Sequence, residues 1–161
     1  MKKLLAVLLV GVLVFSIPAV SSLRLPRAIQ KEIIKTPVVR TDIPDWADGN
    51  ISGVYAEKNE TSGYNILGNV FGYYHISWEN VGYYAGVWET LDGNISGEFA
   101  GWFFYHITFG EYNITGSNET GGFIGLMDFN ESDMTIKSVA LAYNEEDYFL
   151  RYSLCSYTKF E

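Results

Sequence analysis

Glycines set among aromatic residues between positions 71 and 109 constrain the fold more than any other feature of the chain. The stretch reads FGYYHISWENVGYYAGVWETLDGNISGEFAGWFFYHITF. Aromatic and β-branched residues pack well on a pleated surface, and the runs between glycines are too short for helices. Glycine inside a strand marks a bulge, a bend or a close backbone approach. The near-regular spacing of Gly82, Gly86, Gly93, Gly97 and Gly101 therefore predicts a curved, strongly twisted sheet.

The same texture predicts an all-β domain over residues 46–161, built as a twisted antiparallel meander that forms a sheet, a sandwich or an open barrel. Two phrases recur in it, DGNISG at 48–53 and 92–97, and Tyr-His-Ile at 74–76 and 105–107. They indicate a degenerate repeat of hairpins, in which Asp-Gly opens a turn in each copy. Two cleaner strands, 134–142 and 148–157, are expected to pair as a closing hairpin.

The hairpin texture also carries a resemblance. Tyr84, Gly86 and Trp88, followed by the glycines and Phe99 of residues 93–101, resemble the glycine-aromatic hairpins of MORN repeats. The chain as a whole is similar in style to small secreted archaeal β-proteins of unknown function. The resemblance implies an antiparallel meander and brings no activity with it.

The N-terminus has the pattern of an export signal. Lys2 and Lys3 precede an uncharged, mostly apolar run from 4 to 17, and small residues end near 21. This predicts an N-terminal signal helix over residues 1–21 that is removed on secretion. The alternative is an uncleaved membrane anchor over residues 4–23, which just reaches the length of a span. Residues 22–45 follow as a basic, proline-punctuated linker.

Charge excludes one class of partner. Residues 24–40 hold five Lys and Arg against one Glu, whereas from residue 41 onward four Lys and Arg face eighteen Asp and Glu. Nucleic-acid binding by the body is not expected, because phosphate contacts need clustered cations. Contact with a membrane is expected only through the N-terminal segment. The single cysteine, Cys155, allows no intramolecular disulfide, and we expect it to be a small buried apolar residue; an intermolecular disulfide is the alternative.

Six N-glycosylation sequons are the most specific motif in the chain. Asparagine and serine are also common in turns, so turn chemistry is the competing interpretation. With the predicted export signal, the sequons favour modification on a secreted or cell-surface protein. Their acceptors are Asn50, Asn59, Asn94, Asn113, Asn118 and Asn130.

Motifs for catalysis are missing from the sequence. It has no Gly-x-Ser-x-Gly, no His-Glu-x-x-His and no phosphate-binding glycine loop. We therefore expect a structural or adhesive glycoprotein without catalytic activity or cofactor, acting in a cell-surface or extracellular assembly that could include further copies of the chain. The alternative is an extracellular carbohydrate- or calcium-binding β-module.

Three tryptophans, Trp78, Trp88 and Trp102, are the candidate sugar-stacking residues, although cross-strand packing is the simpler explanation of such rings. Asp128, Asn130 and Asp133 have the spacing of half a calcium loop, without its turn glycine or its final glutamate.

His75 and His106 are the only histidines. On paired strands they could bind a transition metal together with a carboxylate. The competing interpretation of both is that they face solvent.

Overall fold

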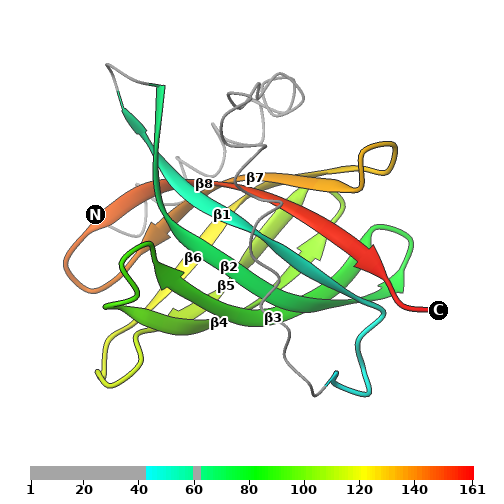
Figure 1. Ribbon diagram of the computed structural model, residues 1–161, viewed down its shortest axis with the longest axis horizontal. Coiled ribbons are helices and arrows are strands. Elements are labelled where there is room, and N and C mark those ends of the chain that lie inside the picture. The colour runs from blue at the N-terminus through cyan, green and yellow to red at the C-terminus, as the bar shows by residue number, and fades with distance from the viewer. Residues whose placement is uncertain (1–42, 60–62) are drawn as a thin grey trace, which may run out of the picture.

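The computed structural model describes residues 43–59 and 63–161, and in this part it contains strands and turns but no helix. None of the described segments is a helix long and apolar enough to cross a membrane. Figure 1 shows the strands winding round a common axis. The strands are β1 Gly49–Asn59, β2 Gly63–Trp78, β3 Val81–Thr90, β4 Ser96–Phe104, β5 Ile107–Asn113, β6 Thr120–Asn130, β7 Thr135–Tyr143 and β8 Tyr148–Lys159.

The sheet closes on itself. Each strand pairs antiparallel with the next, and β1 also pairs with β8, in a register that runs from Gly49↔Lys159 to Ala56↔Tyr152. The expected all-β antiparallel meander is confirmed, but the sheet is a closed barrel rather than an open one. Closure gives the first and last strands partners within the barrel. Residues 57–59 of β1 and 63–66 of β2 extend past the neighbouring ladders and have ladder partners only within their own hairpin.

Glycines on the inner wall make this tight curvature compatible with large side chains. A Cβ at Gly86 would lie 2.2 Å from the carbonyl oxygen of Phe71 and 2.7 Å from the ring of Phe99. At Gly101 it would lie 2.7 Å from the hydroxyl of Tyr84. The missing side chains let rings on one strand rest against the backbone of the next. The predicted close backbone approach is thus confirmed at these positions.

One end of the barrel, which we call the closed end, is filled by aromatic rings. Phe103 and Phe129 have ring centroids 5.3 Å apart, and Tyr157 lies 6.2 Å from Phe129 and 6.0 Å from Tyr74. These residues belong to one cluster of the buried core. The β2–β3, β4–β5 and β6–β7 turns lie at this end. Packing of the rings fills the barrel interior at this end.

The two copies of the repeated phrase do not occupy equivalent places. Asp92-Gly93 forms the β3–β4 turn, where Gly93 has a φ of 70°, as the Asp-Gly signal predicts. The prediction is wrong for the first copy, because Gly49 begins β1 and pairs with Tyr74. There Asp48 accepts a hydrogen bond from the Ile76 N–H at 2.7 Å, which ties the chain to β2 instead of turning it. The Tyr-His-Ile phrases likewise differ, since 74–76 lie within β2, whereas 105–106 form the β4–β5 turn and Ile107 begins β5.

The predicted closing hairpin is confirmed. Residues 134–142 and 148–157 correspond to β7 and β8, which pair throughout from Thr135↔Ser156 to Tyr143↔Tyr148. The predicted signal helix or anchor, and most of the predicted linker, lie outside the described residues.

Candidate functional site

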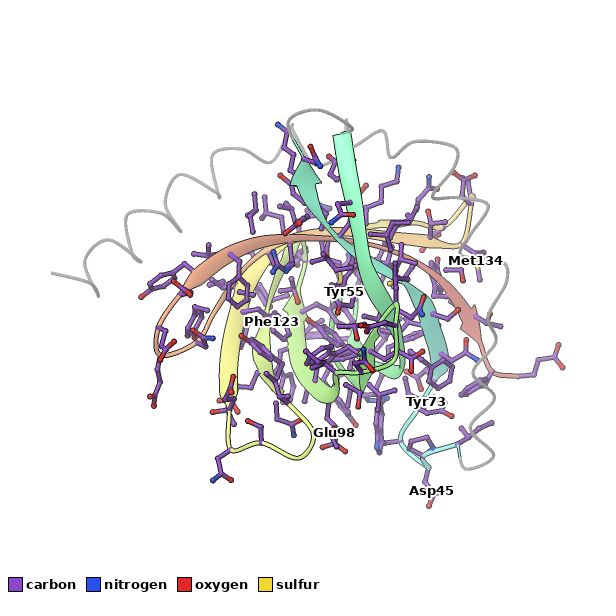
Figure 2. The ribbon with its side chains drawn as sticks, turned by 60° about the vertical axis from the view of Figure 1, so that its left-hand side comes forward. Asp45, Tyr55, Tyr73, Glu98, Phe123 and Met134 are labelled. Carbon is purple, nitrogen blue, oxygen red and sulfur yellow. The ribbon has the colours of Figure 1, made fainter. Side chains whose placement is uncertain are left out.

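A cavity of about 500 Å³ occupies the barrel interior above the aromatic cluster of the closed end. It reaches the rim formed by the β3–β4, β5–β6 and β7–β8 turns, which we call the open end. Ile95, which is 48% exposed, and Asn144 line it there. Figure 2 shows Tyr55 and Phe123 inside the barrel. The cavity wall is mainly apolar and includes Val70, Trp88, Phe99, Phe123, Met127, Ala140 and Ala142.

Inward-facing glycines near the open end explain why the cavity is not filled. The virtual Cβ of Gly97 would lie 2.7 Å from the indole nitrogen of Trp88, and that indole donates a hydrogen bond to the Asn113 carbonyl at 3.2 Å. Tyr112 is placed in the same way against Gly121. Each ring rests on the neighbouring strand and is held along the wall. The lumen between the rings therefore stays open.

Few polar groups face the lumen. Ser138 and Ser153 are hydrogen-bonded through their hydroxyls at 2.7 Å. Deeper in the barrel, Tyr84 and the buried Thr108 share a hydroxyl hydrogen bond, and Thr108 also donates to the Trp102 carbonyl at 3.3 Å. These pairs satisfy each other, so most of the wall offers no unpaired polar atom to a ligand.

Arg151 on β8 is the exception. Of the described residues that line the cavity it is the only cation, and no carboxylate lines it. Its guanidinium lies 4.6 Å above the ring of Phe149 and donates to the Leu150 carbonyl at 3.2 Å. The nearest carboxylate oxygen belongs to Glu57 at the rim, 3.7 Å away. The cavity thus has an apolar depth and one positive charge near its mouth.

Burial governs the ionisation of the interior groups. It raises the pKa of Tyr55 and of Tyr112, while the positive charge of Arg151 acts on both in the opposite direction. Burial also raises the pKa of Tyr84, and it raises that of the Cys155 thiol to about 12. Cys155 is buried as expected, and at neutral pH it is a protonated thiol and a poor nucleophile.

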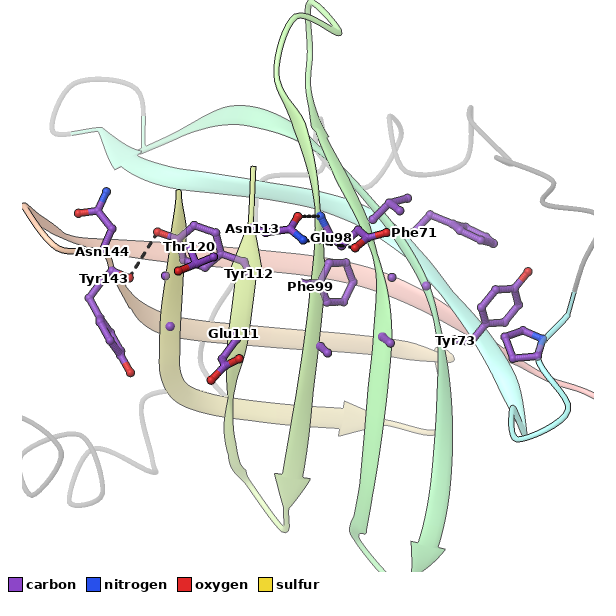
Figure 3. A pocket seen from close by; sticks show the side chains of 18 of the residues that line it. Phe71, Tyr73, Glu98, Phe99, Glu111, Tyr112, Asn113, Thr120, Tyr143 and Asn144 are labelled. Atoms are coloured by element: carbon purple, nitrogen blue, oxygen red, sulfur yellow. Dashed lines mark hydrogen bonds between the residues drawn. The ribbon is translucent and has the colours of Figure 1, made fainter. Parts of the chain in front are cut away.

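A second hollow of about 880 Å³ lies on the outer surface, across β2 to β6 (Figure 3). Ala85 and Ala100 form part of its floor, next to Phe71 and Tyr73. The carboxylates of Glu98, Glu111 and Glu145 line it. Glu98 is fixed by Asn113, whose amide donates to the carboxylate at 3.3 Å and accepts from the Glu98 N–H at 2.8 Å. We call this hollow the outer groove.

The structure does not bring the three candidate tryptophans together. Trp78 is 75% exposed at the end of β2, and Trp102 is 54% exposed on the outer face of β4, where its ring centroid lies 5.3 Å from that of Tyr83. Trp88 faces the interior cavity instead. A shared sugar-stacking surface would have to be built from other rings.

The two histidines are also apart. His75 on β2 has its Nδ1 3.2 Å from a carboxylate oxygen of Asp48 and its ring 5.0 Å from Tyr83. His106 lies in the β4–β5 turn, with Nδ1 3.2 Å from the Met127 carbonyl oxygen. Within residues 43–59 and 63–161, no three His, Cys, Asp or Glu side chains are grouped so that they could hold a metal ion.

The candidate calcium loop forms the β6–β7 turn. Asn130 uses its side-chain oxygen to accept the N–H groups of Ser132 and Asp133, at 3.0 and 3.3 Å. Its amide nitrogen donates to Asp133 at 3.0 Å, and Asp128 lies opposite Lys137 on β7. These contacts give the alternating polar residues a role in shaping the turn.

The sequons are distributed unevenly over the barrel. Asn59, Asn94 and Asn118 are exposed, at the end of β1 and in the β3–β4 and β5–β6 turns, all near the open end. Asn50, Asn113 and Asn130 are partly buried. The exposed three are the acceptors that a glycosylating enzyme would reach most readily.

Sequence reasoning missed the interior cavity and Arg151. Alternation along β8 carried the signal, because Phe149, Arg151, Ser153 and Cys155 share one face of that strand. No family model matches the chain, and neither the curated proteins nor the solved structures compared with it give a match.

Proposed function

We propose that the protein binds one small apolar molecule inside the barrel and acts as its carrier or store outside the cytoplasm. The interior cavity is the observation that carries this proposal. Its volume of about 500 Å³ falls in the range of roughly 300–1,000 Å³ that is typical of small-molecule sites. Its walls are mainly aromatic and aliphatic, as in sites that recognise a ligand by burying its surface.

The interior chemistry supports binding more than covalent reaction. Cys155 is kept protonated by burial, and the Ser138–Ser153 hydroxyls are satisfied by one another. An activated nucleophile needs a basic side chain hydrogen-bonded to it. Among the described residues, none is hydrogen-bonded to the Ser138–Ser153 hydroxyls or to the Tyr84–Thr108 hydroxyls. The location outside the cytoplasm rests on the predicted export signal and the sequons, and it remains a prediction.

Titration of the full chain with a neutral, environment-sensitive naphthylamine dye tests the proposal. We expect one saturable site and displacement of the dye by a long-chain alcohol. Ala140→Phe should weaken binding strongly, because Ala140 lines the cavity and the added ring would occupy it.

Ala100→Phe is the matched control, since it adds the same ring on the outer face, in the floor of the outer groove and not in the interior cavity. Circular dichroism should show that both variants fold. Equal dye binding by both variants, or no saturable binding at all, would refute the proposal.

Carbohydrate binding along the outer groove is the second candidate function. The half-buried ring of Phe71 on β2 and the carboxylates of Glu98 on β4 and Glu111 on β5 line it, and aromatic faces with carboxylate acceptors are suited to sugar rings and hydroxyls. Glycan-array binding should be lost with Phe71→Ala and Glu111→Gln and kept with Trp78→Ala, which lies outside the groove. Binding that ignores the first two changes would count against it. The structural or adhesive role remains a prediction from the sequence.

A further inference from the structure

Arg151 has more hydrogen-bonding capacity than its described neighbours use. A guanidinium carries five N–H donors. Only one hydrogen bond to a described residue is found for it, to the Leu150 carbonyl at 3.2 Å. Its side chain is 30% exposed, so it is partly withdrawn from water at the mouth of an apolar cavity. A partly buried guanidinium with unused N–H donors in this position is suited to bind an anion.

Glu57 neutralises Arg151 only in part. Its oxygen Oε2 lies 3.7 Å from the guanidinium, beyond hydrogen-bonding distance, while Oε1 accepts a hydrogen bond from Asn65 at 3.2 Å. The Glu57 side chain is 43% exposed, and long, exposed pairs of this kind contribute little. An incoming carboxylate that forms two short hydrogen bonds would replace a weak contact with a strong one.

The surroundings of Arg151 complete an amphipathic site. Tyr55 and Tyr112 line the same cavity, and burial keeps both phenols protonated. The Tyr55 hydroxyl can donate to an anion, whereas that of Tyr112 donates to the Tyr143 carbonyl at 3.4 Å. Toward the closed end the cavity is lined by Phe103, Phe129 and Ile136. The polar end of a ligand is thus accommodated near the mouth and its apolar end in the depth.

We propose that the ligand is an amphipathic anion with a long apolar chain, and that its carboxylate binds Arg151 near the open end while the chain lies in the cavity. This inference rests on the proposed function, because it names the class of ligand for the same site. Glu57 then acts as a competitor that the ligand displaces. Affinity should therefore rise when Glu57 loses its charge and fall when Arg151 does.

Binding of hexadecanoic acid and of hexadecan-1-ol to the full chain, measured by calorimetry or dye displacement, tests the inference. The acid should bind the unmodified protein more tightly than the alcohol. Arg151→Met should lower the affinity for the acid by roughly 10- to 100-fold, which corresponds to the loss of a charged hydrogen-bonded contact. It should change the affinity for the alcohol by less than about twofold. Glu57→Gln should tighten the acid severalfold and leave the alcohol unchanged.

The alcohol distinguishes the inference of an anionic ligand from the proposal that the cavity binds apolar molecules. If acid and alcohol bind equally, or if Arg151→Met weakens both alike, the anion inference is overturned while the apolar cavity stands as the binding site. If neither molecule binds, both proposals fail. Arg151→Lys adds a second measure, since it keeps the charge without the planar fork and should lose part of the acid's affinity.

Discussion

Replacing Gly86 by alanine should destabilise the barrel through contact rather than through backbone conformation. The new Cβ would lie 2.2 Å from the Phe71 carbonyl oxygen, 2.6 Å from the Gly72 Cα and 2.7 Å from the Phe99 ring. Two of these neighbours are backbone atoms of β2, which cannot rotate away. The strands would have to separate by about 1 Å to restore ordinary contact distances.

The expected cost follows from overpacking, which typically lowers the free energy of unfolding by about 1–3 kcal/mol. We expect the upper end of that range, because backbone must move. Losing glycine's extra freedom in the unfolded chain offsets only about 0.4–1 kcal/mol. For a domain of this size a net loss of about 2 kcal/mol corresponds to a melting temperature lower by roughly 5–12 °C.

Gly93→Ala is the matched control. Gly93 has a φ of 70° and nothing within 4 Å of its virtual Cβ, so that alanine there costs only the left-handed conformation, about 1 kcal/mol. Both variants would be compared by thermal and urea unfolding, monitored by near-ultraviolet circular dichroism. A Gly86→Ala variant as stable as the parent, or more stable than Gly93→Ala, would refute the steric account of the inner glycines.

Three further predictions concern buried polar groups. Burial raises the pKa of Cys155 from 9.0 to about 12. Between these pH values the folded protein keeps the thiol proton and the unfolded chain loses it. The free energy of unfolding is therefore unaffected below pH 9 and falls as pH rises toward 12. Urea unfolding of Cys155→Ala should therefore depend less steeply on pH in that window, and an unchanged slope would count against the cause given. Ser138→Ala should cost about 1 kcal/mol by leaving Ser153 without its partner, whereas the double alanine variant should recover part of it in the same assay; additive losses would contradict this. Tyr84→Phe should cost about 1 kcal/mol in urea unfolding, because Thr108 keeps its bond to the Trp102 carbonyl, and a loss above about 3 kcal/mol would show that the phenol does more than pair with it.

The antiparallel meander was predictable, and its closure was not. Tyr83, Trp102, Phe109 and Ile124 lie side by side across β3 to β6 on the outer face, so part of the outer wall is as apolar as the inner one. Alternation therefore separates two faces of each strand without saying which one is enclosed. Without that knowledge a sheet, a sandwich and a barrel fit the same pattern.

The site was hidden for a related reason. Tryptophan is a residue type expected on a sugar-stacking surface, and only the pairing of Trp88 with Gly97 shows that Trp88 faces the lumen. Arg151 is one of four bases after residue 41, and alternation groups it with Phe149 and Cys155 without saying that their face is the enclosed one. Likewise Asp48-Gly49 and Asp92-Gly93 have the same local sequence. The first enters β1 because Asp48 is hydrogen-bonded to β2, whereas the second forms a turn.

Pairing of β1 with β8 has a consequence for how the chain reaches its folded state. Seven of the eight ladders join neighbours in sequence, whereas the last joins residues such as Ser52 and Ser156, which are 104 positions apart. Bringing such distant segments together costs about 2 kcal/mol more chain entropy than closing a ten-residue loop.

Hairpins should thus form early and the seam between the first and last strands late, which makes closure the slow step of folding. Until β8 is available, β1 presents an unpaired edge to other chains. Nascent or C-terminally truncated molecules should therefore aggregate far more readily than the complete barrel.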